Sequence, residues 1–160
     1  MMTAFLFDLD DTLYPEQAWR FGGYRAVATV LRQTQYASSS HTEDELAAFC
    51  AAQEVLVGRV GVLSALVDYC GLEHNLLPAL LGVYRTYPRA LAPYPDVIWA
   101  LCALQAARHK IGIVTNGNFA IQIGKLVSLG LRGIFDVIIH ADLIEPKPSY
   151  KPFLVAATAL

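Results

Sequence analysis

Residues 4–14 read AFLFDLDDTLY, an apolar and aromatic run that passes into three carboxylates within four residues. An apolar run without polar alternation is typical of a strand buried on both faces, as in a parallel sheet. Open parallel sheets bind ligands at the carboxyl ends of their strands, which is where Asp8 and Asp10 fall. Because an unpaired buried carboxylate is costly, two of them at one strand end indicate a compensating cation, and oxygen ligands suit Mg²⁺. Taken alone, the D-x-D-x-T string also fits a plain polar turn.

Composition excludes several classes of protein. The 160 residues suffice for one full core, or for a small core with an inserted subdomain. A net charge of −2 with 16% charged residues gives no basic field, so we expect no nucleic-acid partner. The longest apolar runs, such as 97–104 and 153–160, are far shorter than the roughly 20 residues of a membrane span, so we expect no membrane association.

The amino terminus and the cysteines indicate a cytoplasmic protein. Asp8 interrupts the only early apolar run and no basic segment precedes it, so we expect no signal peptide. The three cysteines lie in apolar helical surroundings without C-x-x-C spacing, which is typical of reduced core residues.

Strands and helices of the predicted core alternate along the chain. Strands are expected over 4–9, 111–114 and 135–139, and helices over 96–107, 118–129 and from 150 onward. Asn118 is expected to start the helix that reaches Leu129, and Ser149 to cap the final helix. Strand, helix, strand, helix, strand is the pattern of a right-handed parallel sheet. The predicted fold class is therefore α/β, with a Rossmann-like three-layer core.

A block of helices interrupts this core after the first strand. Residues 16–90 carry helical periodicity almost throughout and no strand signal. The sequence T-x-x-E at 42–45 matches a capping box, and Asn75 is expected to cap the last helix of the block. The serines at 38–40 form a short polar break.

Three motifs in this order resemble the haloacid dehalogenase superfamily, in its phosphatase type with a helical cap after the first strand. They are FDLDDTLY at 7–14, IVTNG at 113–117 and KPSYKPF at 147–153. The similarity of fold runs over essentially the whole chain. It implies two domains: a catalytic core at residues 1–14 plus 95–160, and a helical cap at residues 15–94.

The two aspartates of the first motif indicate a mechanism. Asp8, at the strand tip, is expected to attack phosphorus and become an aspartyl phosphate. Asp10 can protonate the leaving oxygen as a general acid and then activate water. Such neighbours should titrate as a coupled pair, one ionised and the other able to carry a proton. Mg²⁺ beside Asp8 would offset repulsion from the phosphate dianion. The resemblance adds the Asp10 backbone carbonyl to the metal ligands.

The second and third motifs supply groups that can bind phosphate. The Thr115 hydroxyl and the Asn116 backbone N–H could hold phosphate oxygens, while Lys147 screens Asp8 and stabilises the transferring group. The resemblance places the functional lysine before a proline and six residues ahead of a phenylalanine, which selects Lys147 over Lys151. Two alternatives remain open: a solvated loop lysine, and a Thr115 hydroxyl bonded to its own backbone.

Other polar residues near the motifs receive no catalytic role. Thr12 is expected to stabilise its turn, and Asp11 to be a structural or solvated acid. His140 is expected to be a loop histidine after the third strand. In the cap, Trp19 is expected to pack in the core and Arg20 to be a solvated charge.

Asp10 also bears on the reaction. Dehalogenases and phosphonate-cleaving members of the superfamily lack an aspartate two residues after the nucleophile, so the resemblance favours phosphate ester hydrolysis or phosphomutase chemistry. A helical cap generally closes over small soluble substrates. We therefore expect a Mg²⁺-dependent phosphatase for a small phosphorylated metabolite of the nucleotide or sugar phosphate type. The alternative is a catalytically impaired relative that acts through binding or assembly.

The end of the sequence carries a further expectation. The family has a fourth motif, usually an acidic pair after a further strand, which completes the metal site. The sequence stops at Leu160 before such a strand, and its apolar residues 153–160 carry no helix-stop signal. We therefore expect a core truncated at its C-terminus. The first strand would then lie at an exposed sheet edge, through which the chain could self-associate.

Overall fold

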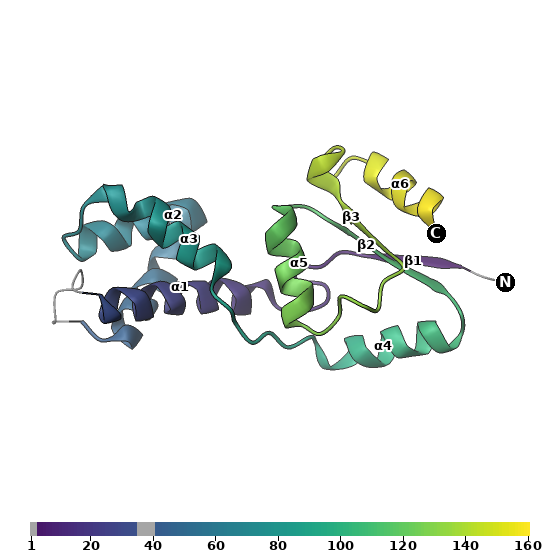
Figure 1. Cartoon of the computed structure of the whole chain (residues 1–160), viewed down its shortest axis with the longest axis horizontal. Helices are drawn as coiled ribbons and strands as arrows, with labels where there is room; N and C mark the ends of the chain where they lie inside the picture. Colours follow the sequence, from purple (N-terminus) through teal and green to yellow (C-terminus); the bar gives the residue numbers. More distant parts are fainter. Residues whose placement is uncertain (1–2, 35–40) are drawn as a thin grey trace. The chain divides into compact units, whose positions relative to one another are not determined.

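The computed structural model describes residues 3–34 and 41–160 (Figure 1). The chain divides into two compact units. The first, hereafter the sheet unit, is Met1–Glu16 with Ala90–Leu160, and the second, the helical unit, is Gln17–Arg89. The predicted polar break at 38–40 lies outside the described residues.

The sheet unit contains three parallel strands in the order β1-β2-β3, which confirms the predicted α/β fold. The strands are β1 (Ala4–Phe7), β2 (Lys110–Thr115) and β3 (Val137–His140). Phe7 pairs with Ile113, and Thr115 pairs with His140. Because all three strands run in the same direction, the segments that follow them meet at one edge of the sheet.

Helices α4 (Pro95–Ala106) and α6 (Lys151–Ala159) lie on opposite faces of this sheet, and α6 contacts all three strands (Figure 1). Gly112 of β2 permits close packing, because a Cβ atom there would lie 2.7 Å from Val137 and 2.8 Å from Leu6. Helix α5 (Phe119–Ser128) begins directly after Asn118, at the predicted position, and the Asn118 side chain accepts a hydrogen bond from the Ile121 N–H.

Two local predictions for the sheet unit are corrected. The N-cap of α6 is Tyr150 rather than Ser149, although the Ser149 hydroxyl accepts a hydrogen bond from the Lys151 N–H at 3.3 Å. The prediction of a strand buried on both faces holds for β2 but is wrong for β1, where Phe5 is 36% exposed. The helices explain the difference, because α4 packs against β2, and α6 contacts β2 and β3 more extensively than β1.

The helical unit has its own hydrophobic core. Helices α1 (Glu16–Gln33), α2 (Glu43–Tyr69) and α3 (Leu77–Thr86) contribute its buried residues, which include Tyr24, Val27, Leu31, Leu46, Cys50, Val62, Leu66, Val67 and Leu80. The predicted capping box at the start of α2 is confirmed, since Thr42 and Glu45 bond each other's backbone N–H.

The predicted cap at Asn75 is wrong. A 3₁₀ turn over His74–Leu76 precedes α3, whose N-cap is Leu76. The Asn75 side chain instead donates a hydrogen bond to the carboxylate of Glu73 at 2.7 Å.

Helix α2 is broken at Gly58, where φ is 70° and ψ is 166°. Glycine adopts this backbone without the clash that a Cβ atom would cause.

By length and composition, α2 is the one helix in the described parts of the chain that could cross a membrane.

Arg89 joins the two ends of the helical unit. Its guanidinium donates a hydrogen bond to the Trp19 carbonyl at 2.7 Å and another to the Tyr84 carbonyl, and it stacks over the Trp19 ring. Arg20 is not the solvated charge that we predicted. Its Nε lies 2.7 Å from Oε1 of Glu54, and its side chain is largely buried. The reason is that α2 places the Glu54 carboxylate beside α1.

Candidate active site

A tight turn after β1 presents the first motif. The N–H groups of Thr12 and Leu13 donate to the Leu9 carbonyl, and Leu9 and Leu13 are fully buried. Asp11 adopts a left-handed backbone conformation, and its carboxylate accepts a hydrogen bond from the Glu16 N–H at the start of α1. Asp11 is therefore a structural acid, and the turn fixes the backbone that carries Asp8 and Asp10.

Asp8 pairs with Lys147, which comes from the segment between β3 and α6. The distance from Lys147 Nζ to Asp8 Oδ1 is 2.7 Å. Lys147 Nζ also donates to the Val114 carbonyl at 3.1 Å. The Asp8 side chain is 43% exposed and that of Lys147 is 19% exposed. The carboxylate thus has a cation beside it and an open side, which is what a nucleophile for an anionic substrate requires.

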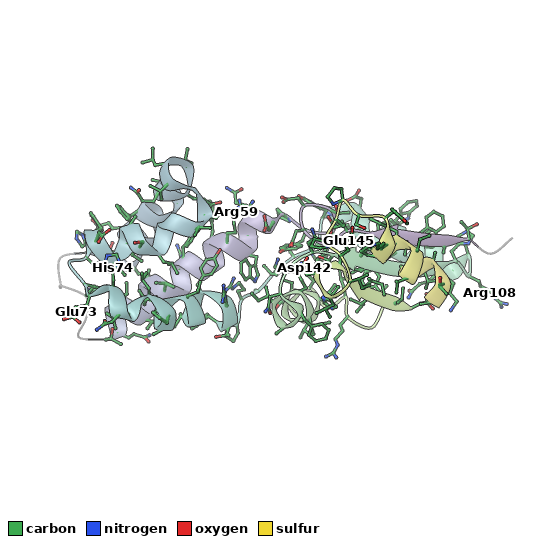
Figure 2. All side chains as sticks on the ribbon, turned by 90° about the horizontal axis from the view of Figure 1, so that it is seen from above. Arg59, Glu73, His74, Arg108, Asp142 and Glu145 are labelled. Atoms are coloured by element: carbon green, nitrogen blue, oxygen red, sulfur yellow. The ribbon has the colours of Figure 1, made fainter. Side chains whose placement is uncertain are left out.

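Asn116 holds the backbone of Lys147 in place. The Asn116 side-chain oxygen accepts from the Lys147 N–H at 2.9 Å, and its amide nitrogen donates to the Lys147 carbonyl at 3.4 Å. The next residue, Gly117, donates its N–H to the carboxylate of Asp142 at 2.9 Å. Asp142 and Glu145 extend from the segment that follows β3 (Figure 2). The loops after β2 and β3 are therefore joined by hydrogen bonds next to Asp8.

Asp10 belongs to a second set of contacts, made with α5. Lys125 Nζ lies 2.8 Å from both carboxylate oxygens of Asp10. The Tyr14 hydroxyl donates to Oδ1 at 2.6 Å, and the Gln122 side-chain amide donates to Oδ2 at 3.0 Å. Lys125 is 4% exposed, so this ion pair is almost completely buried on the lysine side.

These contacts set the charge of Asp10. Burial raises the pKa of this carboxyl, but the Lys125 ammonium and the hydrogen bonds from Lys125, Tyr14 and Gln122 outweigh it. The pKa of Asp10 consequently lies below its usual value. Lys125 thus provides a balancing charge beside Asp10, and the expected coupled titration of Asp8 and Asp10 stays a prediction.

Thr115 lies with Asp10 rather than with Lys147. Its hydroxyl is buried, accepts a hydrogen bond from the Gln122 amide at 2.7 Å and donates to the Asn116 carbonyl at 3.3 Å. The reason is the alternation of side chains along a strand. It places the Thr115 side chain on the opposite face of the sheet from the Val114 side chain, which packs against Ala156 of α6, the helix that follows Lys147. The Thr115 hydroxyl thus contacts the adjacent backbone carbonyl, and its expected contact with phosphate stays a prediction.

His140 is the last residue of β3 and not the loop histidine that we predicted. Its ring packs on Phe119 with centroids 4.3 Å apart, and its side chain is buried. Neither ring nitrogen has a hydrogen-bond partner among the described residues. Burial lowers the pKa of His140, and the nearby Asp142 carboxylate only partly offsets this.

Sequence reasoning missed three side chains: Tyr14, Gln122 and Lys125. Gln122 and Lys125 are three residues apart in a predicted helix, so they share a face, and they interrupt an otherwise apolar stretch. That interruption is the signal that could have identified them.

The residues present fit a magnesium ion held in part by water and substrate. No group of three or more His, Cys, Asp or Glu side chains gathers within residues 3–34 and 41–160. Mg²⁺ is usually bound by one or two carboxylates together with waters and substrate phosphate. The half-exposed Asp8 carboxylate and the Asp10 backbone carbonyl are oxygen donors of the required kind.

Comparison with known proteins gives a consistent result. Residues 5–160 match the family described as haloacid dehalogenase-like hydrolase. The chain is 33% identical to a glyceraldehyde 3-phosphate phosphatase of Methanopyrus kandleri, over 100% of the chain and 71% of that protein. It is 28% identical to a phosphatase of the same name from Methanothermobacter thermautotrophicus, over 96% of the chain and 69% of that protein.

Solved structures share the fold. A Thermotoga maritima protein assigned as a β-phosphoglucomutase superposes with a TM-score of 0.70 at 23% identity, over 98% of the chain and 70% of that protein. A Bacillus subtilis protein described as a HAD-type hydrolase bound to magnesium superposes with a TM-score of 0.64 at 22% identity, over 99% of the chain and 72% of that protein.

Proposed function

The chain belongs to the haloacid dehalogenase-like hydrolases, and on this premise we propose that it is a Mg²⁺-dependent phosphatase that acts through an aspartyl phosphate. The observation that carries the proposal is the pair of Asp8 and Lys147 at the end of β1. Its carboxylate is exposed enough to be reached, and its lysine is close enough to offset the charge of an incoming phosphate.

In the proposed first step, a carboxylate oxygen of Asp8 forms a bond to phosphorus while the ester P–O bond breaks. The Lys147 ammonium offsets negative charge on the transferring group. The leaving oxygen takes its proton from Asp10, so one carboxylate oxygen of Asp10 must first take up a proton from solvent, while the other oxygen keeps its contact with Lys125. When bound beside Asp8, Mg²⁺ would reduce the repulsion between the carboxylate and the phosphate dianion.

In the proposed second step, water attacks the phosphorus of the aspartyl phosphate and Asp8 is released. Asp10, ionised again, accepts the proton of this water. The contacts that lower the pKa of Asp10 favour the ionised form that this second step needs. The two steps together hydrolyse one phosphomonoester and leave Asp8 ionised and Asp10 protonated, as both were at the start of the first step.

The proposed substrate is a small sugar phosphate. Support comes from the two relatives, both named glyceraldehyde 3-phosphate phosphatase, which align with 100% and 96% of the chain. The helical unit, for which we propose the role of a cap, is the part of the chain that would restrict substrate size. The core residues 1–14 plus 95–160 would carry the chemistry, with Asn116 holding the loop of Lys147.

The test is hydrolysis of glyceraldehyde 3-phosphate and of p-nitrophenyl phosphate by the full chain, with Mg²⁺ and with EDTA. Asp8→Asn is expected to abolish turnover, because an amide cannot form the acyl phosphate. Asp68→Asn is the matched control, since Asp68 pairs with His74 on the surface of the helical unit. Full turnover by Asp8→Asn, with contaminating phosphatase excluded, would refute the mechanism. A folded but inactive chain would favour a binding role.

A further inference from the structure

Three side chains donate hydrogen bonds to the Asp10 carboxylate. Lys125 contacts both of its oxygens, Tyr14 donates to Oδ1 and Gln122 donates to Oδ2. A carboxylate held through both oxygens has a fixed position and a fixed plane. The proposed mechanism uses Asp10 but assigns nothing to the residues that hold it.

Gln122 connects Asp10 to the neighbouring strand. Its side-chain amide nitrogen lies 2.7 Å from the Thr115 hydroxyl oxygen and 3.0 Å from Asp10 Oδ2. Gln122 and Thr115 are 2% and 1% exposed, so water does not compete for these bonds. One amide group therefore links the end of β2 to the turn that follows β1.

Helix α5 is well suited to hold this link. Asn118 caps its first turn, and the fully buried Leu126 anchors it to the sheet unit. Gln122 and Lys125 are one helical turn apart and project from the same face. The stem of Lys125 is buried as well as its ammonium, so it has little freedom to choose another acceptor.

We propose that Gln122 and Lys125 are positioning residues that hold the Asp10 carboxylate, and the Thr115 hydroxyl beside it, in the geometry required for proton transfer at the proposed phosphatase site. The inference rests on the proposed function, in which Asp10 transfers the proton of the leaving group. It assigns no contact between these two side chains and the substrate.

The kinetic test compares two phosphomonoesters that differ in leaving group. An alkyl phosphate needs its leaving oxygen protonated, whereas p-nitrophenyl phosphate releases a stable phenolate. Lys125→Met should reduce kcat for the alkyl ester about 10–100-fold, part of the factor that general acid catalysis supplies, and reduce kcat for the aryl ester clearly less. KM should change less than about twofold, because the residues do not touch substrate.

Conservative variants separate positioning from folding. Lys125→Arg keeps a cation that can donate to both oxygens and should recover part of the lost kcat. Gln122→Met keeps the volume of the side chain, removes both hydrogen bonds and should show the same dependence on leaving group. Lys110→Met, which removes a lysine paired with Asp136 outside the site, is the control.

Failure of the positioning role and failure of the proposed phosphatase activity give different results in these experiments. Equal losses on both esters, or a change confined to KM, would overturn the inference and leave a phosphatase. If the unmodified chain hydrolyses neither ester, the proposed function fails, and the inference is then decided by crystal structures of Lys125→Met and Gln122→Met. A displaced Asp10 carboxylate supports positioning. An Asp10 carboxylate and a Thr115 hydroxyl that stay in place refute it.

Discussion

The ion pair between Asp10 and Lys125 should contribute measurably to the stability of the sheet unit. Removing one member of a buried ion pair costs about 3–5 kcal/mol, because the other charge remains buried. In Lys125→Met, Asp10 keeps its bonds from Tyr14 and Gln122 and is 25% exposed. We therefore expect a loss of about 2–3 kcal/mol in the free energy of unfolding, below the usual range.

A double-mutant cycle isolates the pair. Asp10→Asn removes the charge that Lys125 faces, and the combination of Asp10→Asn with Lys125→Met removes both charges. The double variant should lose less than the sum of the single losses, with a coupling of about 1–3 kcal/mol. Lys151→Met is the control, because its ion pair with Glu145 is exposed and should contribute little.

The pH dependence has a definite sign. The pKa of Asp10 is lower in the folded chain than the value of about 3.9 expected when unfolded. Its stabilising contribution is therefore fully present above that unfolded value and is lost as the pH falls through the lower folded pKa. The coupling should be complete at pH 7 and should shrink below about pH 4.

The assay is urea unfolding at pH 7 and at pH 3, monitored by circular dichroism. Because the chain has two compact units, hydrogen exchange of peptides from β2 and α5 identifies the transition that belongs to the sheet unit. A coupling below about 0.5 kcal/mol at pH 7, which is the size seen for independent sites, would refute the reasoning. So would a coupling that persists unchanged at pH 3.

Other parts of the chain give further expectations. Gly23→Ala should destabilise the helical unit, because the new Cβ would lie 2.6 Å from the ring of Tyr84. At Gly82 an added Cβ meets nothing within 4 Å, so Gly82→Ala should stabilise the unit by about 0.5–1 kcal/mol. Thermal unfolding should therefore show a lower Tm for the first variant and a higher Tm for the second. Burial raises the pKa of the Cys50 thiol to about 12, so Ellman's reagent should modify the exposed Cys102 in the native chain and Cys50 only after unfolding. Lys147→Met should weaken tungstate binding by about tenfold or more in calorimetry, because a charge-assisted hydrogen bond is lost. The chain should also self-associate through the edge of β1, which light scattering tests; a monomer at all concentrations would contradict it.

Local signals predicted the fold where they act over a few residues. The apolar run of β2, the capping box before α2 and the helix start at Asn118 each involve neighbours in sequence, and all three are confirmed. The burial of β1 and the cap at Asn75 were predicted wrongly. Burial depends on how the helices cover each strand, and they cover β2 and β3 more fully than β1. The Asn75 amide donates to the carboxylate of Glu73, and the helix begins after Leu76 instead.

In the candidate site, too, some contacts could be predicted from the sequence and others could not. The proximity of Asp8 and Lys147 follows from the parallel sheet, since the segments after its strands meet at one edge. The contacts of Asp10 with Gln122 and Lys125 could not be predicted, because they depend on the rotation of α5 about its axis relative to the sheet. Motif spacing carries no information about that rotation.

The pairing of the strands also determines when the sheet can form during synthesis. β1 ends at Phe7, yet its partner β2 begins only at Lys110, so β1 leaves the ribosome well before β2 is synthesised. At roughly 5–20 residues per second, β1 waits on the order of 5–20 s for this partner, longer than a small helical unit needs to fold. The apolar segment at residues 4–7 is therefore exposed at the stage when the nascent chain has no sheet to receive it. Chaperones that bind short apolar segments would have an opportunity to bind there, before β2 is synthesised.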